Sequence, residues 1–264
     1  MRLAALLGAM GAFLLLAGPG HAGTVEDEAI ARSQAAIGRP VAGFAFTTGD
    51  GRRLAIEEFR GKPLLVTLIY TSCADVCPAV IESLAAAAAA ADDQLGADSY
   101  RVLTIGFDTA SDTPDRMRSF ARARGVDKAN WVFAAADPGA VDRFAEAVGF
   151  SYFASAGGFN HPAQVTLIDR DGRVYDQVYG GSFDPPALIE PLKRLIFCGA
   201  RPLFSLSCLG DRIKLFCTVY DPRTGRYYFD YSLFVTILIG AFCLAGALWF
   251  LVREARKSLT SGGA

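Results

Sequence analysis

The strongest constraint on the fold is a short apolar run that leads directly into a helix start. Residues Leu64 to Tyr70 are almost all apolar, which is typical of a strand covered on both faces of a sheet. Cys77 and Pro78 then begin a helix that runs through the alanines at 85–91, because proline suits the first helical position and alanine has the highest helix propensity. A buried strand followed at once by a helix predicts an α/β domain.

The same alternation of strand and helix signals continues along the chain. Further strands are expected at residues 43–46, 53–55, 102–107, 131–135, 164–168 and 173–179. Further helix starts are expected where Thr or Asp precedes a proline, at residues 113–114, 137–138 and 184–185. We therefore expect one compact α/β domain over residues 35–197, with a central mixed sheet flanked by helices.

The N-terminus has the pattern of an export signal. Arg2 supplies a basic start, an apolar stretch from Leu3 to Ala17 follows, and small residues end at Ala22. We expect a signal peptide over residues 1–22 and a short polar leader over 23–34. An uncleaved membrane anchor is the alternative, which the short apolar run disfavours.

A second apolar run, Ser232 to Val252, holds 21 residues without a charge. At about 1.5 Å per residue, its length matches a hydrocarbon layer of roughly 30 Å. Aromatic residues flank it, as at membrane interfaces: Tyr227, Tyr228, Tyr231 and Trp249. We expect a single transmembrane helix at 232–252; a buried core helix is the alternative. With the export signal, this places the main domain outside the cytoplasmic (inner) membrane and residues 253–264 in the cytoplasm.

The connector between domain and membrane, residues 198–231, carries three cysteines of its own. Cys198, Cys208 and Cys217 fit no standard metal-binding spacing. Export makes disulfides possible, so we expect one structural disulfide and one remaining thiol; a copper relay or an intermolecular bridge is the alternative. Cys243 lies in the expected membrane helix and is interpreted as a small apolar residue.

Charge argues against one class of partner. The net charge is −1, and no block of like charges is long enough to bind a phosphate backbone. We expect no nucleic acid partner.

The strongest chemical signal is the pair Cys73 and Cys77 at the junction between the buried strand and the helix. If Cys77 caps that helix, its sulfur lies near free backbone N–H groups, which favour the thiolate. Two thiolates four residues apart can bind one soft metal ion or oxidise to a disulfide. A purely structural disulfide is the alternative, but closing so short a loop contributes little loop entropy.

His161 is the second chemical signal. If the signal peptide is removed, His161 is the one histidine of the folded domain, and Gly157, Gly158 and Pro162 around it indicate a loop. A lone histidine is usually not a ligand. Together with two thiolates, however, an imidazole would make a set that favours Cu(I), accommodates Cu(II) and could also hold zinc.

Three blocks of sequence resemble the Sco/SenC family of copper-handling proteins. They are Cys73-Ala74-Asp75-Val76-Cys77-Pro78, the aspartate-rich segment 107–114 that ends in Asp112-Thr113-Pro114, and His161 eight residues before Asp169. The resemblance covers roughly residues 38–196. It departs from the family pattern at Asn160 and Pro162, where members commonly have Asp before the histidine and Ser or Thr after it. It also departs in its C-terminal rather than N-terminal anchor and in the connector.

The resemblance implies a thioredoxin-like fold in which the loop before strand 164–168 faces the cysteine loop. It implies copper, as Cu(I) or Cu(II), bound by Cys73, Cys77 and His161. It also implies a partner, the copper-bearing subunit of cytochrome c oxidase or another copper or thiol protein.

Three aspartates near the site are interpreted separately. Asp75 lies between the thiols and either tunes their charge or is a solvated loop carboxylate. Asp108 is expected to support the metal loop by contacting it, without binding the metal itself. Asp112 is expected to be a turn or cap residue at the helix start.

Three functions remain open. The first is a membrane-anchored copper chaperone for a cytochrome c oxidase copper centre. The second is a thiol–disulfide oxidoreductase that uses Cys73 and Cys77 as its redox pair and does not need His161. The third and least favoured is a peroxiredoxin-like peroxidase, for which Thr71 and Ser72 precede Cys73 but no arginine can be assigned.

Overall fold

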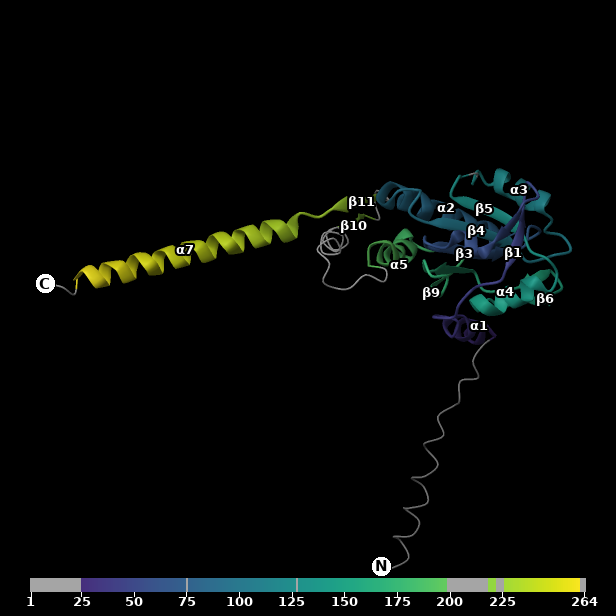
Figure 1. The fold of residues 1–264 in the computed structure, drawn as a ribbon, viewed down its shortest axis with the longest axis horizontal. Helices are drawn as coiled ribbons and strands as arrows, with labels where there is room; N and C mark the ends of the chain where they lie inside the picture. The colour runs from purple at the N-terminus through teal and green to yellow at the C-terminus, as the bar shows by residue number, and fades with distance from the viewer. Residues whose placement is uncertain (1–24, 75, 127, 199–217, 222–225, 262–264) are drawn as a thin grey trace, which may run out of the picture.

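The computed structural model describes residues 25–261, except 75, 127, 199–217 and 222–225. Its core is a seven-stranded mixed sheet (Figure 1). In spatial order the strands are β2 (Arg53–Ala55), β1 (Ala45–Thr48), β5 (Trp131–Ala135), β4 (Arg101–Gly106), β3 (Leu64–Ile69), β8 (Gln164–Ile168) and β9 (Val174–Tyr179). All six residues of β3 and all five of β8 are buried, as the continuous apolar runs predict.

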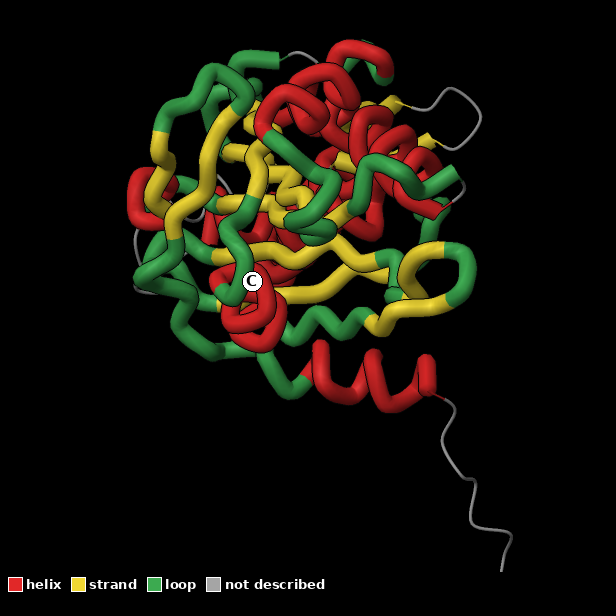
Figure 2. Tube along the Cα trace, turned by 90° about the vertical axis from the view of Figure 1, so that its right-hand side faces the viewer, coloured by secondary structure: helices red, strands yellow, loops and turns green. Residues whose placement is uncertain are grey.

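Helices pack against the central sheet (Figure 2). They are α1 (Val25–Gln34), α2 (Val76–Leu95), α3 (Pro114–Ala123), α4 (Ala140–Val148) and α5 (Pro185–Cys198), with a short 3₁₀ helix at Ile56–Phe59. Helices α2 and α5 pack together, and α3 packs against β1 and β5. The α/β prediction is confirmed.

The strand directions place two distant loops at one edge of the sheet. Strands β3 and β4 run parallel, whereas β8 runs antiparallel to β3, with Val165 opposite Thr67. The carboxyl ends of β3 and β4 therefore lie at the same edge as the amino end of β8. The segment after β3 carries the cysteines, and the segment before β8 carries His161.

Two helix starts show how well capping chemistry can be predicted. At α3, the Thr113 side chain accepts a hydrogen bond from the Arg116 amide and Pro114 is the first helical residue, as expected. At α4 the prediction is wrong. The helix begins at Ala140, directly after Gly139, and Gly139 has the left-handed backbone conformation. The Asp137 carboxylate binds Arg53 instead, so this Asp-Pro pair precedes the helix by a turn.

Residues 25–34, expected to be a polar leader, form helix α1 and pack against β9. Ala29 and Ser33, one helical turn apart, are buried. The Tyr179 hydroxyl donates to Ser33 Oγ at 2.8 Å and receives a hydrogen bond from Gln34 Nε2 at 2.7 Å. The sequence of this segment is mostly polar because only a narrow stripe of small residues on the helix faces the sheet.

A second difference concerns the approach to His161. The glycine-rich stretch expected to be a loop is a hairpin of β6 (Phe153–Ser155) and β7 (Gly158–Asn160). Ala156 and Gly157 form the turn, and Gly158, the first residue of β7, has φ +125°. His161 directly follows β7.

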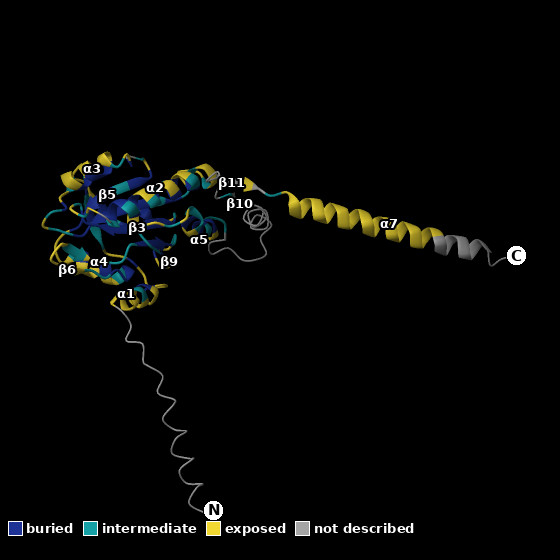
Figure 3. Cartoon of the chain, turned by 180° about the vertical axis from the view of Figure 1, so that it is seen from behind, coloured by how far each residue is buried: buried dark blue, intermediate teal, exposed yellow. Residues whose placement is uncertain are grey.

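The C-terminal part holds the hairpin strands β10 (Thr218–Asp221) and β11 (Arg226–Phe229), and helix α7 (Ser232–Ser261). Within the described residues, Ser232–Arg253 is the one helical stretch long and apolar enough to cross a membrane, with a mean hydropathy of 2.4 and none of it buried. It extends away from the domain with its apolar side chains exposed (Figure 3). The alternative of a buried core helix is wrong.

Candidate metal centre

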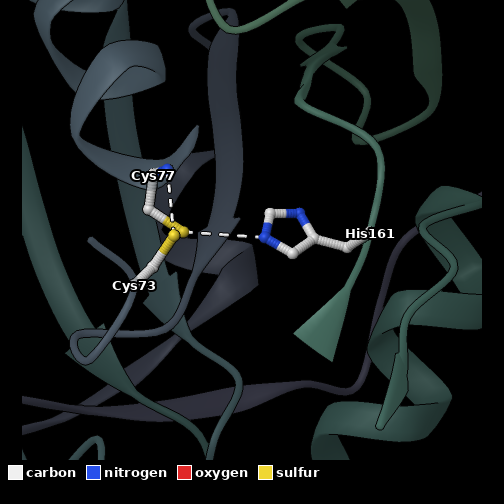
Figure 4. Close-up of side chains that lie close together, drawn as sticks. All are labelled: Cys73, Cys77 and His161. Carbon is white, nitrogen blue, oxygen red and sulfur yellow. Dashed lines mark hydrogen bonds between the residues drawn. The ribbon is translucent and has the colours of Figure 1, made fainter. Parts of the chain in front are cut away.

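The structure brings Cys73, Cys77 and His161 together at the predicted sheet edge (Figure 4). The two Sγ atoms and one imidazole nitrogen all lie within 4.8 Å of one another. Two sulfurs that share a metal ion, each about 2.3 Å from it, can be no more than about 4.6 Å apart. The three donor atoms can therefore meet one ion with only small movements.

The two thiols have different positions relative to α2. Because α2 begins at Val76, Cys77 lies inside its first turn, and the prediction that Cys77 caps the helix is wrong. The Cys77 amide donates to Cys73 Sγ at 3.3 Å. The sulfur next to the free N–H groups and the positive end of the helix dipole is therefore that of Cys73.

Burial sets the protonation of the other two donors. It raises the pKa of the Cys77 thiol above its ordinary value, because a thiolate is poorly solvated there. It also lowers the pKa of His161, against the opposing effect of the Pro162 carbonyl. A neutral thiol and a neutral imidazole therefore face each other, with Cys77 Sγ 3.6 Å from His161 Nε2.

The tautomer of His161 follows from its second contact. Nδ1 lies 3.0 Å from the Pro162 carbonyl oxygen, which can only accept a hydrogen bond, so Nδ1 carries the proton. The lone pair of Nε2 is then directed at Cys77. A backbone carbonyl on the far nitrogen is one of the common supports for a metal-binding histidine.

An aromatic cluster holds the imidazole, and sequence reasoning missed it. The ring centroid of His161 lies 5.7 Å from Tyr70, 5.4 Å from Phe107 and 5.6 Å from Phe150. Tyr152 and Phe159 complete the cluster. Phe150, Tyr152 and Phe159 precede His161 in the same segment, whereas Tyr70 and Phe107 come from segments far away in the sequence. The sequence spacing of Tyr70 and Phe107 therefore carried no signal that they share a site with His161.

Tyr70 connects the cluster to the cysteine loop. Its carbonyl accepts a hydrogen bond from the Cys73 amide at 3.1 Å. Burial, and then the hydrogen bond of its hydroxyl to the Cys73 side chain, raise the pKa of Tyr70. Gly158 lies close against this hydroxyl: a Cβ at Gly158 would be 2.9 Å from Tyr70 Oη.

The carboxylate that supports the cysteine loop is Asp112. It is only 1% exposed and accepts hydrogen bonds from the amide and hydroxyl of Thr71 at 2.8 and 2.6 Å. The amide of Asp108 donates to its other oxygen at 2.9 Å. The expectation of a simple turn residue is wrong for Asp112, since its side chain ties the segment after β3 to the segment after β4.

The remaining candidate residues lie outside the described residues, lack a described side chain or lie away from the site. Asp75, Cys208 and Cys217 lie outside the described residues, and Cys198 ends α5 without a described side chain. Cys243 is exposed on α7, far along the chain from the site. The predicted pairing among the connector cysteines stays a prediction.

One side of the imidazole borders a cavity of about 470 Å³. Its walls come from α1, the start of α2, the β6–β7 hairpin and the end of β9; the lining includes Ile30, Val76, Phe153 and Gly181. The cavity thus reaches His161, whereas Cys73 and Cys77 are not among its lining residues.

Comparison with curated proteins found relatives with short matching regions. The protein sco1 of Schizosaccharomyces pombe is 34% identical over 88 residues, which is 33% of this chain and 33% of that protein. The chain spans less than half of the length of each curated relative that it matches.

Solved structures share the fold, and two of them illustrate the likeness. ScoI of Bradyrhizobium japonicum, solved with copper bound, is 24% identical and covers 60% of this chain and 99% of its own, with a TM-score of 0.50. BsSco, described with a disulfide switch and as a member of the Sco family of cytochrome c oxidase assembly proteins, is 20% identical and covers 59% and 92%, with a TM-score of 0.54. The thioredoxin-like fold is confirmed.

The family model described as SCO1/SenC matches residues 32–197, which is more than half of the chain and includes the whole expected domain. Its match includes the cysteine pair, the aspartate segment and His161. The chain therefore belongs to the SCO1/SenC family.

Proposed function

We propose that this protein is a membrane-anchored copper chaperone. It holds one copper ion through Cys73, Cys77 and His161 and delivers it to the copper-bearing subunit of cytochrome c oxidase. The observation that carries the proposal is the convergence of these three donor atoms within 4.8 Å. The copper-bound state of the B. japonicum relative and the oxidase-assembly description of BsSco support it.

Copper is the cargo of this site, and the donor set suits it. Thiolates are soft ligands that favour Cu(I), and the imidazole allows Cu(II) as well. Binding replaces the Cys77 thiol proton, which faces His161 Nε2, with the metal ion. Cys73 is only half-buried and Ala74 is exposed. Ligands of an acceptor protein can therefore approach on that side and take over the ion by stepwise exchange.

The test separates His161 from the thiols. The His161→Ala variant should lose stoichiometric copper after dialysis against a chelator, yet still reduce a small disulfide at close to the normal rate. Tyr152→Phe is the matched control, because it keeps the ring of the aromatic cluster and removes only a hydroxyl bound to Asp142. Full copper loading in the His161→Ala variant would contradict the proposal.

A second function, thiol–disulfide exchange, is favoured by the Cys77 amide that donates to Cys73 Sγ. In this reaction the Cys73 thiolate attacks a partner's disulfide and releases one partner thiolate. Cys77 loses its proton and displaces the second, so that two electrons pass to the partner and Cys73 and Cys77 become a disulfide. Cys77→Ser should trap the mixed disulfide on a non-reducing gel. Absence of any trapped adduct with Cys77→Ser would exclude this function.

The proposed anchor is α7, with the domain on the extracytoplasmic side of the inner membrane. Its exposed apolar surface and hydropathy of 2.4 support a membrane span. The full chain should stay in the membrane pellet after an alkaline carbonate wash, and protease added to spheroplasts should digest the domain. A domain that is protected until the cells are lysed would reverse the proposed orientation.

A further inference from the structure

A buried carboxylate connects the cysteine loop to the rest of the domain. Asp112 Oδ1 accepts from both the amide and the hydroxyl of Thr71, which lies two residues before Cys73. Asp112 Oδ2 accepts from the amide of Asp108. With these three donors, the carboxylate links the segments that follow β3 and β4, the two parallel strands that end beside the metal centre.

The fold makes room for this side chain. Gly106 is the last residue of β4, and a Cβ there would lie 2.5 Å from Asp112 Cβ and 2.7 Å from Met117 Sδ. Asp112 therefore occupies the space that a larger residue at position 106 would need. Burying a carboxylate is unfavourable unless its oxygens are hydrogen-bonded, and here both are.

The three donor residues depend on Asp112 to different degrees. Cys77 is held by the first turn of α2, and the His161 ring is held by the aromatic cluster and the Pro162 carbonyl. Cys73 belongs to neither a helix nor a strand, and its segment leaves β3 through Thr71. Cys73 contacts Tyr70 in the same segment and the Cys77 amide at the start of α2. The Thr71–Asp112 contact adds a side-chain hydrogen bond from this segment to the segment after β4.

We propose that Asp112 is a positioning residue that holds the Thr71–Cys73 segment, so that Cys73 Sγ stays within reach of the ion bound by Cys77 and His161. The proposal rests on the copper-binding function and assigns Asp112 no contact with the metal. Loss of the carboxylate should weaken the contribution of Cys73 to copper binding while leaving Cys77 and His161 in place.

Two pairs of variants test this. Asp112→Asn keeps the shape but turns an N–H donor toward either Thr71 or Asp108, where an acceptor is required. Thr71→Val removes the hydroxyl, whereas Thr71→Ser keeps it and should behave like the unchanged protein. Thr104→Val is the control for general loss of stability, because it removes the buried partner of Trp131 Nε1 away from the site.

Copper affinity and its spectrum are the first readout. Asp112→Asn should lower copper affinity on the order of 10–100-fold, as expected for the removal of a group that orients a metal ligand. The thiolate-to-Cu(II) charge-transfer bands should weaken or shift, with a smaller effect for Thr71→Val. If Asp112→Asn lowers the melting temperature as Thr104→Val does, but leaves affinity and spectrum unchanged, Asp112 is only a structural residue and the proposal is wrong.

A metal-free readout separates this proposal from the copper function. In the reduced protein without copper, mass spectrometry after brief treatment with iodoacetamide should show faster alkylation of Cys73 in Asp112→Asn than in the unchanged chain, with Cys77 still protected. If the unchanged chain binds no copper, the chaperone proposal fails while the alkylation result still decides the role of Asp112. Equal alkylation of Cys73 in both proteins would overturn that role.

Discussion

The two loops that form the metal centre are held in contrasting ways. The cysteine loop is tied by a polar contact, in which the Asp112 carboxylate binds Thr71. The histidine loop is held mainly by ring packing, with Phe107 5.4 Å from the His161 ring. Hydrogen bonds are directional and can be removed one at a time, whereas packing is shared among many atoms. Loss of the ring packing around His161 should therefore destabilise the core as well, whereas loss of the Asp112 contact should disturb only the cysteine loop.

The largest effect is expected on the aromatic side. Phe107 is 2% exposed and contacts four other rings besides His161. Phe107→Ala should lower the free energy of unfolding by about 3–5 kcal/mol and abolish copper retention at the same time. Urea denaturation of the metal-free protein and a copper titration measure the two effects. Lost copper binding with unchanged stability would mean that the histidine loop is not coupled to the core.

A smaller effect on the same side is expected at Gly158, where β7 begins. Gly158 has φ +125°, and an added Cβ would lie 2.9 Å from Tyr70 Oη. Gly158→Ala should therefore cost about 1–3 kcal/mol and reduce copper affinity by moving Tyr70 or His161. Gly157→Ala is a close control, because nothing lies within 4 Å of its Cβ position. Equal stability and equal copper affinity of the two variants would show that the contact between Gly158 and Tyr70 does not help to position His161.

The smallest effect is a pH dependence of the metal-free protein. The folded pKa of His161 lies below its ordinary value of 6.5, so the unfolded chain binds the proton more readily and stability falls as the pH drops below about 6.5. The folded pKa of Cys77 lies above its ordinary value of 9.0, so the unfolded chain loses its proton first and stability falls as the pH rises past about 9.

Denaturation curves of the unchanged chain and a variant, measured at several pH values, isolate the contribution of each group to the pH dependence of stability. The difference in unfolding free energy between the unchanged chain and His161→Gln should change between neutral pH and pH 5, and the difference from Cys77→Ser should change between pH 8 and pH 10. Differences that stay constant across both intervals would show that neither group is buried in the way the structure has it.

Much of the fold could be predicted because its signals are local. The apolar runs of β3 and β8 predicted buried strands, and the Thr113-Pro114 pair predicted the start of α3. The failures were also local in origin. The hairpin of β6 and β7 is mostly exposed and glycine-rich, so it carries little hydrophobic pattern.

The site was predictable only in part. Cys73, Cys77 and His161 are rare residue types at the edge of the sheet, and their chemistry made them visible. The supports are common residue types whose roles depend on tertiary contacts. Nothing local distinguishes Phe107 as a neighbour of His161, or Asp112 as the partner of Thr71, until β3, β4 and β8 are aligned.

The coordination of bound copper tests the central claim most directly. X-ray absorption of the reduced protein loaded with one equivalent of copper should show two sulfur ligands and one nitrogen ligand from imidazole. The imidazole signal should disappear in His161→Ala, and one sulfur should disappear in each of Cys73→Ser and Cys77→Ser. A copper ion bound by two sulfurs alone, with the same spectrum in His161→Ala, would contradict the account.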